Sequence, residues 1–148
     1  MALVDTAIAT VHLLIGALWV GSVGFFAGVV LPMARDGGLD AGPLESMMTS
    51  LTRWSRIASV LMLVTGGHLA ATGYTFGTLA STTNGNLVVA MVVLWLALTG
   101  LVEVGGSRLR DGVERKKVRE PAATALGVYR GAAVVGALLL VVAGAIVT

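Results

Sequence analysis

The residues best able to do chemistry in this chain are its two histidines, His12 and His68, which both lie inside long apolar segments. An imidazole is costly to place in lipid, so an ionisable residue there is a candidate functional group. If the two segments run antiparallel, both histidines lie about two helical turns, or roughly 8–10 Å, below the same membrane face. Neutral imidazole nitrogen is a common ligand of copper and of haem iron. The spacing therefore predicts that the two histidines share one site near that face.

A thioether lies at a matching depth in a third apolar segment, at Met91. Thioether sulfur is a soft ligand that selects Cu(I), although methionine is also a common filler of protein cores. Two imidazoles and a thioether on three segments predict a metal site formed by His12, His68 and Met91. A second interpretation stays open, in which each imidazole only joins two helices by hydrogen bonding to a carbonyl or a hydroxyl.

Three polar residues lie close to the histidines and are expected to support them. Asp5 precedes His12 by seven residues, which places both on one face of a helix. Its carboxylate can orient the imidazole by accepting a hydrogen bond, although solvation alone also explains a carboxylate near a helix start. Thr65 and Thr72 share a helical face with His68.

An ionic group is expected near the opposite membrane face. Glu103 lies at the end of the third apolar segment, and Arg56 and Arg130 lie at the start of the second and fourth. Opposite charges at one depth favour a structural ion pair. Passage of ions or protons along these groups is the second interpretation.

Small residues are expected to set how the helices pack. One group lies close to the histidines and either leaves room for a bulky ligand or serves close helix packing: Gly16, Gly66 and Gly67. A second group repeats along the first apolar segment and predicts close packing of that helix within the bundle: Ala17, Gly21, Gly24 and Gly28.

The composition indicates which solvent surrounds these residues. Of the 148 residues, 56% are hydrophobic and only 12% are charged, and the mean hydropathy is +0.90. A soluble domain has about 25% charged residues, so too few polar residues remain here to cover a surface in water, and most of the chain must lie in lipid. The chain has no cysteine, which excludes disulfides, thiolate metal sites, iron–sulfur clusters and thiol catalysis. The sequence contains no nucleophile–base pair, phosphate-binding loop or nucleotide motif, so nothing favours an enzyme over a binding or transport protein.

Four apolar segments are long enough to span a bilayer, which takes about 20 residues: residues 6–31, 57–74, 87–104 and 128–147. They predict an all-α fold, an integral membrane four-helix bundle that forms a single domain. Pro32 is expected to end the first helix and Gly105–Gly106 the third, whereas Pro121 suits the first turn of a helix and allows the fourth to begin early. Apolar residues at helical spacing between Leu44 and Leu51 indicate either a short amphipathic helix on the membrane surface or an early start of the second helix.

The loops between the segments fix the expected orientation. The loops before the second and fourth segments carry the cations, which are Arg35, Arg53, Arg108, Arg110, Arg115, Lys116, Lys117 and Arg119. The middle loop, residues 75–86, carries no charge. By the positive-inside rule the two basic loops are cytoplasmic, and both termini and the middle loop lie outside the cytoplasmic membrane. Because orientation explains the pI of about 9.5, we expect no nucleic-acid partner.

Two strings of residues resemble the CopD copper-resistance family. The first is His12-Leu-Leu-Ile-Gly-Ala-Leu-Trp19-Val-Gly21, and the second is Arg53-Trp-Ser-Arg56, followed by Leu63-Val-Thr65-Gly66. The resemblance implies a membrane protein with a four-helix core that moves copper across the cytoplasmic membrane. The first string is also similar to the HemJ-type protoporphyrinogen oxidases, four-helix proteins that hold haem b through a histidine at the position of His12. The chain lacks the lysine in a membrane segment and the aromatic-rich end of the first helix expected for those oxidases, which argues against porphyrinogen oxidation.

Three functions follow as expectations. The first is copper handling, with the ion entering from outside, where the ligands lie. The second is a b-type cytochrome for membrane electron transfer, with His12 and His68 as axial ligands of haem b, although neighbouring helices about 8–10 Å apart leave little room for a porphyrin. The third is a scaffold or subunit without a cofactor. The expected partners are the lipid bilayer, an extracytoplasmic copper or electron carrier and a second copy of this chain.

Overall fold

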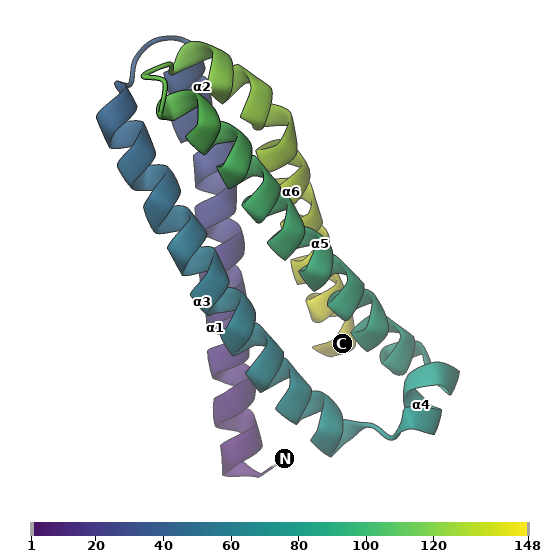
Figure 1. The fold of residues 1–148 in the computed structure, drawn as a ribbon. Coiled ribbons are helices and arrows are strands. Elements are labelled where there is room, and N and C mark those ends of the chain that lie inside the picture. The colour runs from purple at the N-terminus through teal and green to yellow at the C-terminus, as the bar shows by residue number, and fades with distance from the viewer. Residues whose placement is uncertain (1, 148) are drawn as a thin grey trace.

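A computed structural model describes residues 2–147 of the protein (Figure 1). Within this range the chain is built from helices and short connections, with no strand. The helices are α1 (Leu3–Phe25), the π-helical turn η1 (Phe26–Val30), α2 (Leu31–Arg35), α3 (Ala41–Gly73), α4 (Phe76–Ser81), α5 (Thr83–Val113) and α6 (Arg119–Val147). The all-α class predicted from the sequence is confirmed.

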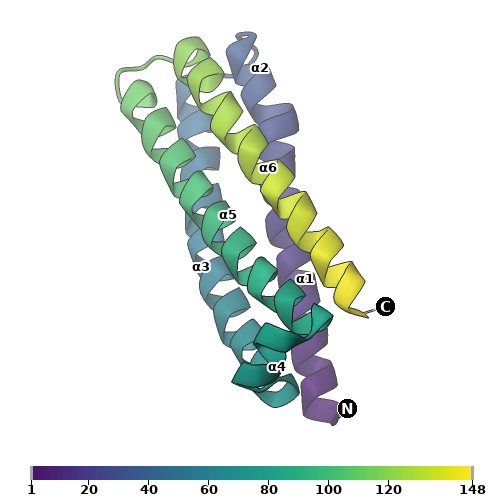
Figure 2. The same ribbon diagram turned by 90° about the vertical axis from the view of Figure 1, so that its right-hand side faces the viewer.

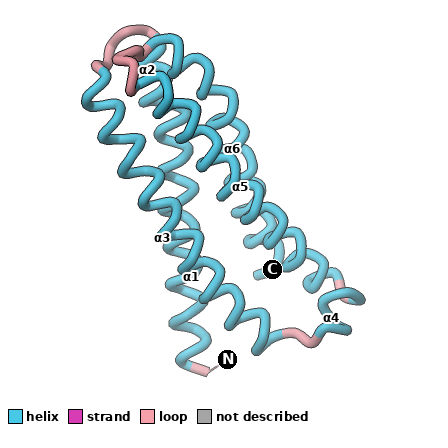
Figure 3. The backbone as a smooth tube through the Cα atoms, viewed as in Figure 1, coloured by secondary structure: helices cyan, strands magenta, loops and turns pink. Residues whose placement is uncertain are grey.

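Four helical columns lie side by side and alternate in direction (Figures 1 and 2). The first column runs without a break through α1, η1 and α2, and the others are α3, α5 and α6. Both α1 and α5 pack against α3 and α6, so the columns follow the order α1, α3, α5, α6 around the bundle. The N-terminus and α4 lie at one end, which we call the α4 end. The loops 36–40 and 114–118 lie together at the other end, which we call the basic end (Figure 3).

Three of the columns are long and apolar enough to cross a membrane: Leu3–Arg35, Thr83–Val113 and Arg119–Ile146. Column α3, which contains the predicted span 57–74, is not among these candidates. Polar residues lower its hydropathy, among them Ser59, Thr65 and His68. The described part of the chain thus has the helices of a membrane protein, with three candidate spans.

Pro32 does not end the first helix, contrary to the prediction from the sequence. A proline lacks the N–H of the helical hydrogen bond, and its ring clashes with the carbonyl group four residues back. Here the wider turn η1 directly precedes the proline and accommodates it, so the column continues to Arg35. The chain turns away at Gly37, whose φ of +84° is a left-handed conformation that glycine adopts readily.

Two other helices begin earlier than the predicted spans. Helix α3 starts at Ala41, so the residues between Leu44 and Leu51 are an early start of this helix and not a separate amphipathic helix. Leu44 and Leu51 are buried, which shows that this extension packs on the bundle. Helix α6 also begins early, with Pro121 in its first turn as expected. The uncharged middle connection contains the short helix α4.

Gly105 and Gly106 do not end the third predicted helix. Their lack of a side chain instead allows this helix to pack closely against α6. A Cβ added at Gly105 would lie 2.8 Å from Cε2 of Tyr129. The ring of Tyr129 is fully buried and meets Phe26 edge to face, with ring centroids 4.8 Å apart. Helix α5 therefore continues to Val113.

The glycines expected to pack the first helix into the bundle face outward. Gly21, Gly24 and Gly28 have no neighbouring atom within 4 Å of the place where a Cβ would lie, and Ala17 is exposed. The prediction of close packing within the bundle on this face is wrong. Helix α1 instead turns its other side, with Trp19 and Val23, toward the core.

Gly105→Ala should destabilise the protein, because the added methyl group meets the closely packed ring of Tyr129. Overpacking of this kind costs about 1–3 kcal/mol, and the better helix propensity of alanine offsets only about 1 kcal/mol of it. Thermal unfolding in detergent should therefore show a lower Tm. Gly24→Ala is the matched control, because its methyl group meets no atom, and its Tm should be unchanged or higher. Equal Tm changes in the two variants would contradict this packing.

Candidate metal site

A small cavity lies among the four columns, in the half of the bundle nearer the α4 end. It is lined by His12, Leu13, Gly16, Trp19 and Val20 of α1, by Met62 of α3, by Met91 of α5 and by Leu139, Leu140 and Ala143 of α6. Its volume of about 20 Å³ leaves room for one occupant of the size of a water molecule or a metal ion. The cavity therefore has room for a single ion or water molecule and not for an organic ligand.

One ring nitrogen of His12 is bound and the other is not. Nδ1 lies 2.6 Å from Oγ1 of Thr65, and the Thr65 hydroxyl donates its only proton to the carbonyl group of Leu61 at 2.7 Å. Nδ1 of His12 therefore carries a proton and donates to Thr65, an assignment made from the hydrogen-bond pattern. Nε2 then holds a lone pair, and it has no hydrogen-bond partner among the described residues. This is the form in which an imidazole binds a metal ion.

Gly66 allows the imidazole to lie against α3. A Cβ added at Gly66 would lie 2.9 Å from Cε1 of His12, closer than two carbon atoms approach without one of them moving. The sequence suggested that Gly66 leaves room for a bulky ligand. In the structure this glycine makes room for the ring of His12 itself. Gly67 faces open space.

Met62 is the cavity residue that sequence reasoning missed. Its side chain is buried, and its Cε lies 3.2 Å from the place of a Cβ on Gly16, so Gly16 makes room for the thioether. One signal was present, because Met62 lies three residues before Thr65 and so on the same face of α3. The residue type alone does not separate a ligand from a core filler. Together with Met91, it brings two thioethers to the cavity that His12 lines.

His68 does not line this cavity. Its Nε2 lies 3.1 Å from Oδ1 of Asp5, and 40% of its side chain is exposed. The structure therefore brings His12 and Met91 together but places His68 about one turn further toward the α4 end. Asp5, expected beside His12, contacts His68 instead. Thr72 donates to the backbone carbonyl of His68 and not to its ring.

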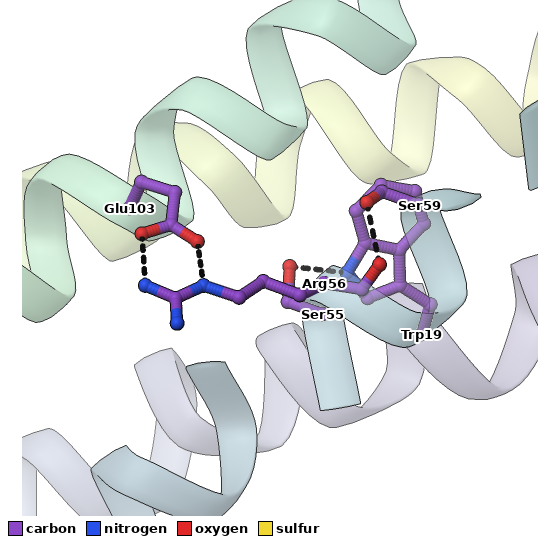
Figure 4. A network of polar contacts seen from close by, with 5 residues as sticks. All are labelled: Trp19, Ser55, Arg56, Ser59 and Glu103. Carbon is purple, nitrogen blue, oxygen red and sulfur yellow. Dashed lines mark hydrogen bonds and ion pairs between the residues drawn. The ribbon is translucent and has the colours of Figure 1, made fainter. Parts of the chain in front are cut away.

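On the basic side of the cavity, hydrogen bonds tie three columns together (Figure 4). The indole Nε1 of Trp19 donates to the hydroxyl of Ser55 at 3.0 Å, and both side chains are buried. The indole of Trp95 on α5 donates to the carbonyl group of Ser59 at 3.1 Å, and the Ser59 hydroxyl donates to the carbonyl group of Arg56 at 2.9 Å. These bonds fix α1 and α5 against α3 next to the cavity.

The expected ion pair forms between Arg56 and Glu103 (Figure 4). The guanidinium donates two hydrogen bonds to the carboxylate, at 2.7 and 3.0 Å. Arg130 is exposed, and in the described part of the chain no ion pair joins it to these two residues. Because the pair links α3 to α5 in a two-pronged geometry, it fits the structural interpretation.

Haem does not fit this cavity. A volume of about 20 Å³ holds one ion, whereas a porphyrin ring is many times larger. The second proposed axial ligand, His68, is bound to Asp5 outside the cavity. No three side chains of His, Cys, Asp or Glu gather as a metal site in residues 2–147, so a metal ion bound here would need thioether ligands.

Comparison with known proteins connects the chain to one family. Residues 45–148 match the family model CopD, described as copper resistance protein D. The match covers α3 to α6, with Met62 and Met91, and does not include His12. No curated protein and no solved structure matches the chain.

The imidazole of His12 should be the Nδ1–H tautomer at neutral pH, because Thr65 accepts that proton. Nitrogen NMR of ring-labelled protein, assigned with a His12→Gln variant, should show a protonated Nδ1 and a bare Nε2. Gly66→Ala should shift both resonances, since its methyl group displaces the ring, whereas Gly67→Ala should leave them in place. A proton on Nε2 in the wild-type protein would contradict this geometry.

Proposed function

This chain belongs to the CopD family of copper resistance proteins, and we propose that it binds copper at the cavity beside His12 and passes it across the cytoplasmic membrane. The observation that carries the proposal is the set of donors around this cavity. A bare imidazole nitrogen and two thioethers are copper ligands, and the cavity has room for one ion. The hard cations Mg²⁺ and Ca²⁺ need oxygen ligands, and no carboxylate lines the cavity.

The proposal includes α3 as a fourth membrane span. Helix α3 lies alongside the three apolar columns and packs against α1 and α5. Several of its polar groups turn toward other columns, whereas its outward surface is apolar, with Ile57, Val60, Leu61, Leu63 and Val64 exposed. A helix of this kind is stable in lipid only if its neighbours satisfy its polar groups.

The proposed orientation places the basic end in the cytoplasm. That end carries the excess of Lys and Arg, in the loop 114–118 and on the adjoining helix ends, and cationic segments of this kind stay inside. The cavity then lies in the outer half of the membrane, with the pair of Asp5 and His68 between it and the outer surface. An ion delivered by an extracytoplasmic carrier would meet this pair before the cavity.

Tags at both termini should be accessible from outside intact cells, because the basic loops hold the opposite end inside. A tag inserted in the loop 114–118 should become accessible only after the cells are permeabilised. Protease protection or labelling of a cysteine introduced in the tag provides the measurement. A cytoplasmic C-terminus would overturn the proposed topology.

His12→Ala should remove most of the copper that purifies with the protein and lower copper accumulation in cells that express it. His68→Ala should have a smaller effect, because its ring lies outside the cavity. Bound copper should also fall at acidic pH, since a protonated imidazole does not bind metal. Metal analysis by mass spectrometry measures both effects. Copper content unchanged by His12→Ala would overturn the site beside His12. A wild-type protein without copper would favour a scaffold, and a Soret band would favour a cytochrome.

A further inference from the structure

We infer that the cavity is a Cu(I) site with three ligands, which are Nε2 of His12 and the thioether sulfurs of Met62 and Met91. The inference rests on the proposed function and deepens it, because it fixes the oxidation state of the ion and replaces one of the ligands expected from the sequence. Met62 takes the place of His68.

The donors favour a soft, singly charged ion. Two thioethers and one imidazole are all neutral, and no carboxylate or thiolate lines the cavity. Removing an ion from water costs more as its charge rises, so neutral ligands in an apolar surrounding can compensate a monovalent ion more readily than a divalent one. Thioether sulfur is also a soft ligand that suits Cu(I), whereas Cu(II) prefers nitrogen and oxygen donors. Both arguments point to Cu(I).

The three residues line the cavity from three different columns. His12 on α1 is oriented by Thr65, which leaves Nε2 without a partner. Met62 on α3 is only 8% exposed and packs against Gly16, and Met91 on α5 is partly buried against the core. The contribution of α6 to the cavity is entirely apolar. The lining therefore offers no fourth donor side chain, so the inferred coordination number is three.

The experiment compares methionine variants that keep the size of the side chain. Met62→Leu and Met91→Leu should each weaken Cu(I) binding by about tenfold or more, and His12→Gln should weaken it at least as much. Leucine replaces methionine in a core at small cost in stability. Met48→Leu is the matched control, because Met48 is 1% exposed but does not line the cavity, and its affinity should equal that of the wild type. Purified full-length protein is titrated in detergent with Cu(I), kept reduced by ascorbate, against a colorimetric Cu(I) chelator.

X-ray absorption of the wild-type protein loaded with Cu(I) gives a test that needs no variant. It should show sulfur and nitrogen scatterers in a ratio of two to one, and a spectrum with nitrogen and oxygen alone would overturn the ligand set. Met62→Leu with the affinity of Met48→Leu would overturn it too. Either result leaves the proposed function standing if His12→Ala still lowers copper accumulation in cells. If the wild type binds no Cu(I) and cellular copper does not depend on the protein, the proposed function itself fails.

Discussion

The arrangement of the bundle depends on the buried hydrogen bond that joins α1 to α3. The indole of Trp19 donates to the hydroxyl of Ser55, and neither group has access to solvent. In an apolar surrounding each of these groups is costly without its partner, so the bond holds the two helices at one relative height. About two turns along α1 from Trp19 and nearly three along α3 from Ser55, the same seam brings His12 to Thr65. The orientation of the imidazole follows from this register, as does the position of Gly66 under its ring.

The polar residues of α3 explain both its low hydropathy and its place in the site. Ser55, Ser59 and Met62 are buried, and Thr65 continues the same side of the helix. The hydroxyls of Ser55, Ser59 and Thr65 are bonded within the bundle, to an indole, a backbone carbonyl group and the imidazole respectively. A helix that presented only leucine and valine to its neighbours would be apolar enough to count as a candidate span. It would offer no side chain that could position a ligand. The feature that separates α3 from the three candidate spans is thus the one that lets it position His12.

Sequence reasoning identified what depends on composition and order along the chain. The apolar segments, the basic loops, and the position of His12 and Met91 at one depth came from residue types and order along the chain. Equal depth does not tell which way a side chain points around its helix axis. The sequence therefore predicted His68 in the site, whereas its ring lies beside Asp5. The helix ends predicted at Pro32 and at Gly105–Gly106 were wrong. The π-helical turn η1 lets the first column continue past Pro32, and the glycines make room for the ring of Tyr129 within a continuous α5. Met62 went unnoticed, since its spacing from Thr65 does not separate a ligand from a core filler, and its packing against Gly16 is seen only in the structure.

A protein that passes an ion onward must bind it well enough to take it up and weakly enough to let it go. A carboxylate in the cavity would add charge attraction in an apolar surrounding, where Coulomb energies are large, and would hold the ion too firmly. No carboxylate lines the cavity, and two that lie within the helical columns are found elsewhere: Asp5 beside His68 near the α4 end, and Glu103 beside Arg56 toward the basic end. Each is paired with a group that can carry positive charge, so neither is left to trap a cation. If copper binds at the proposed site, neutral donors between two paired carboxylates would make its affinity depend on ligand softness and geometry.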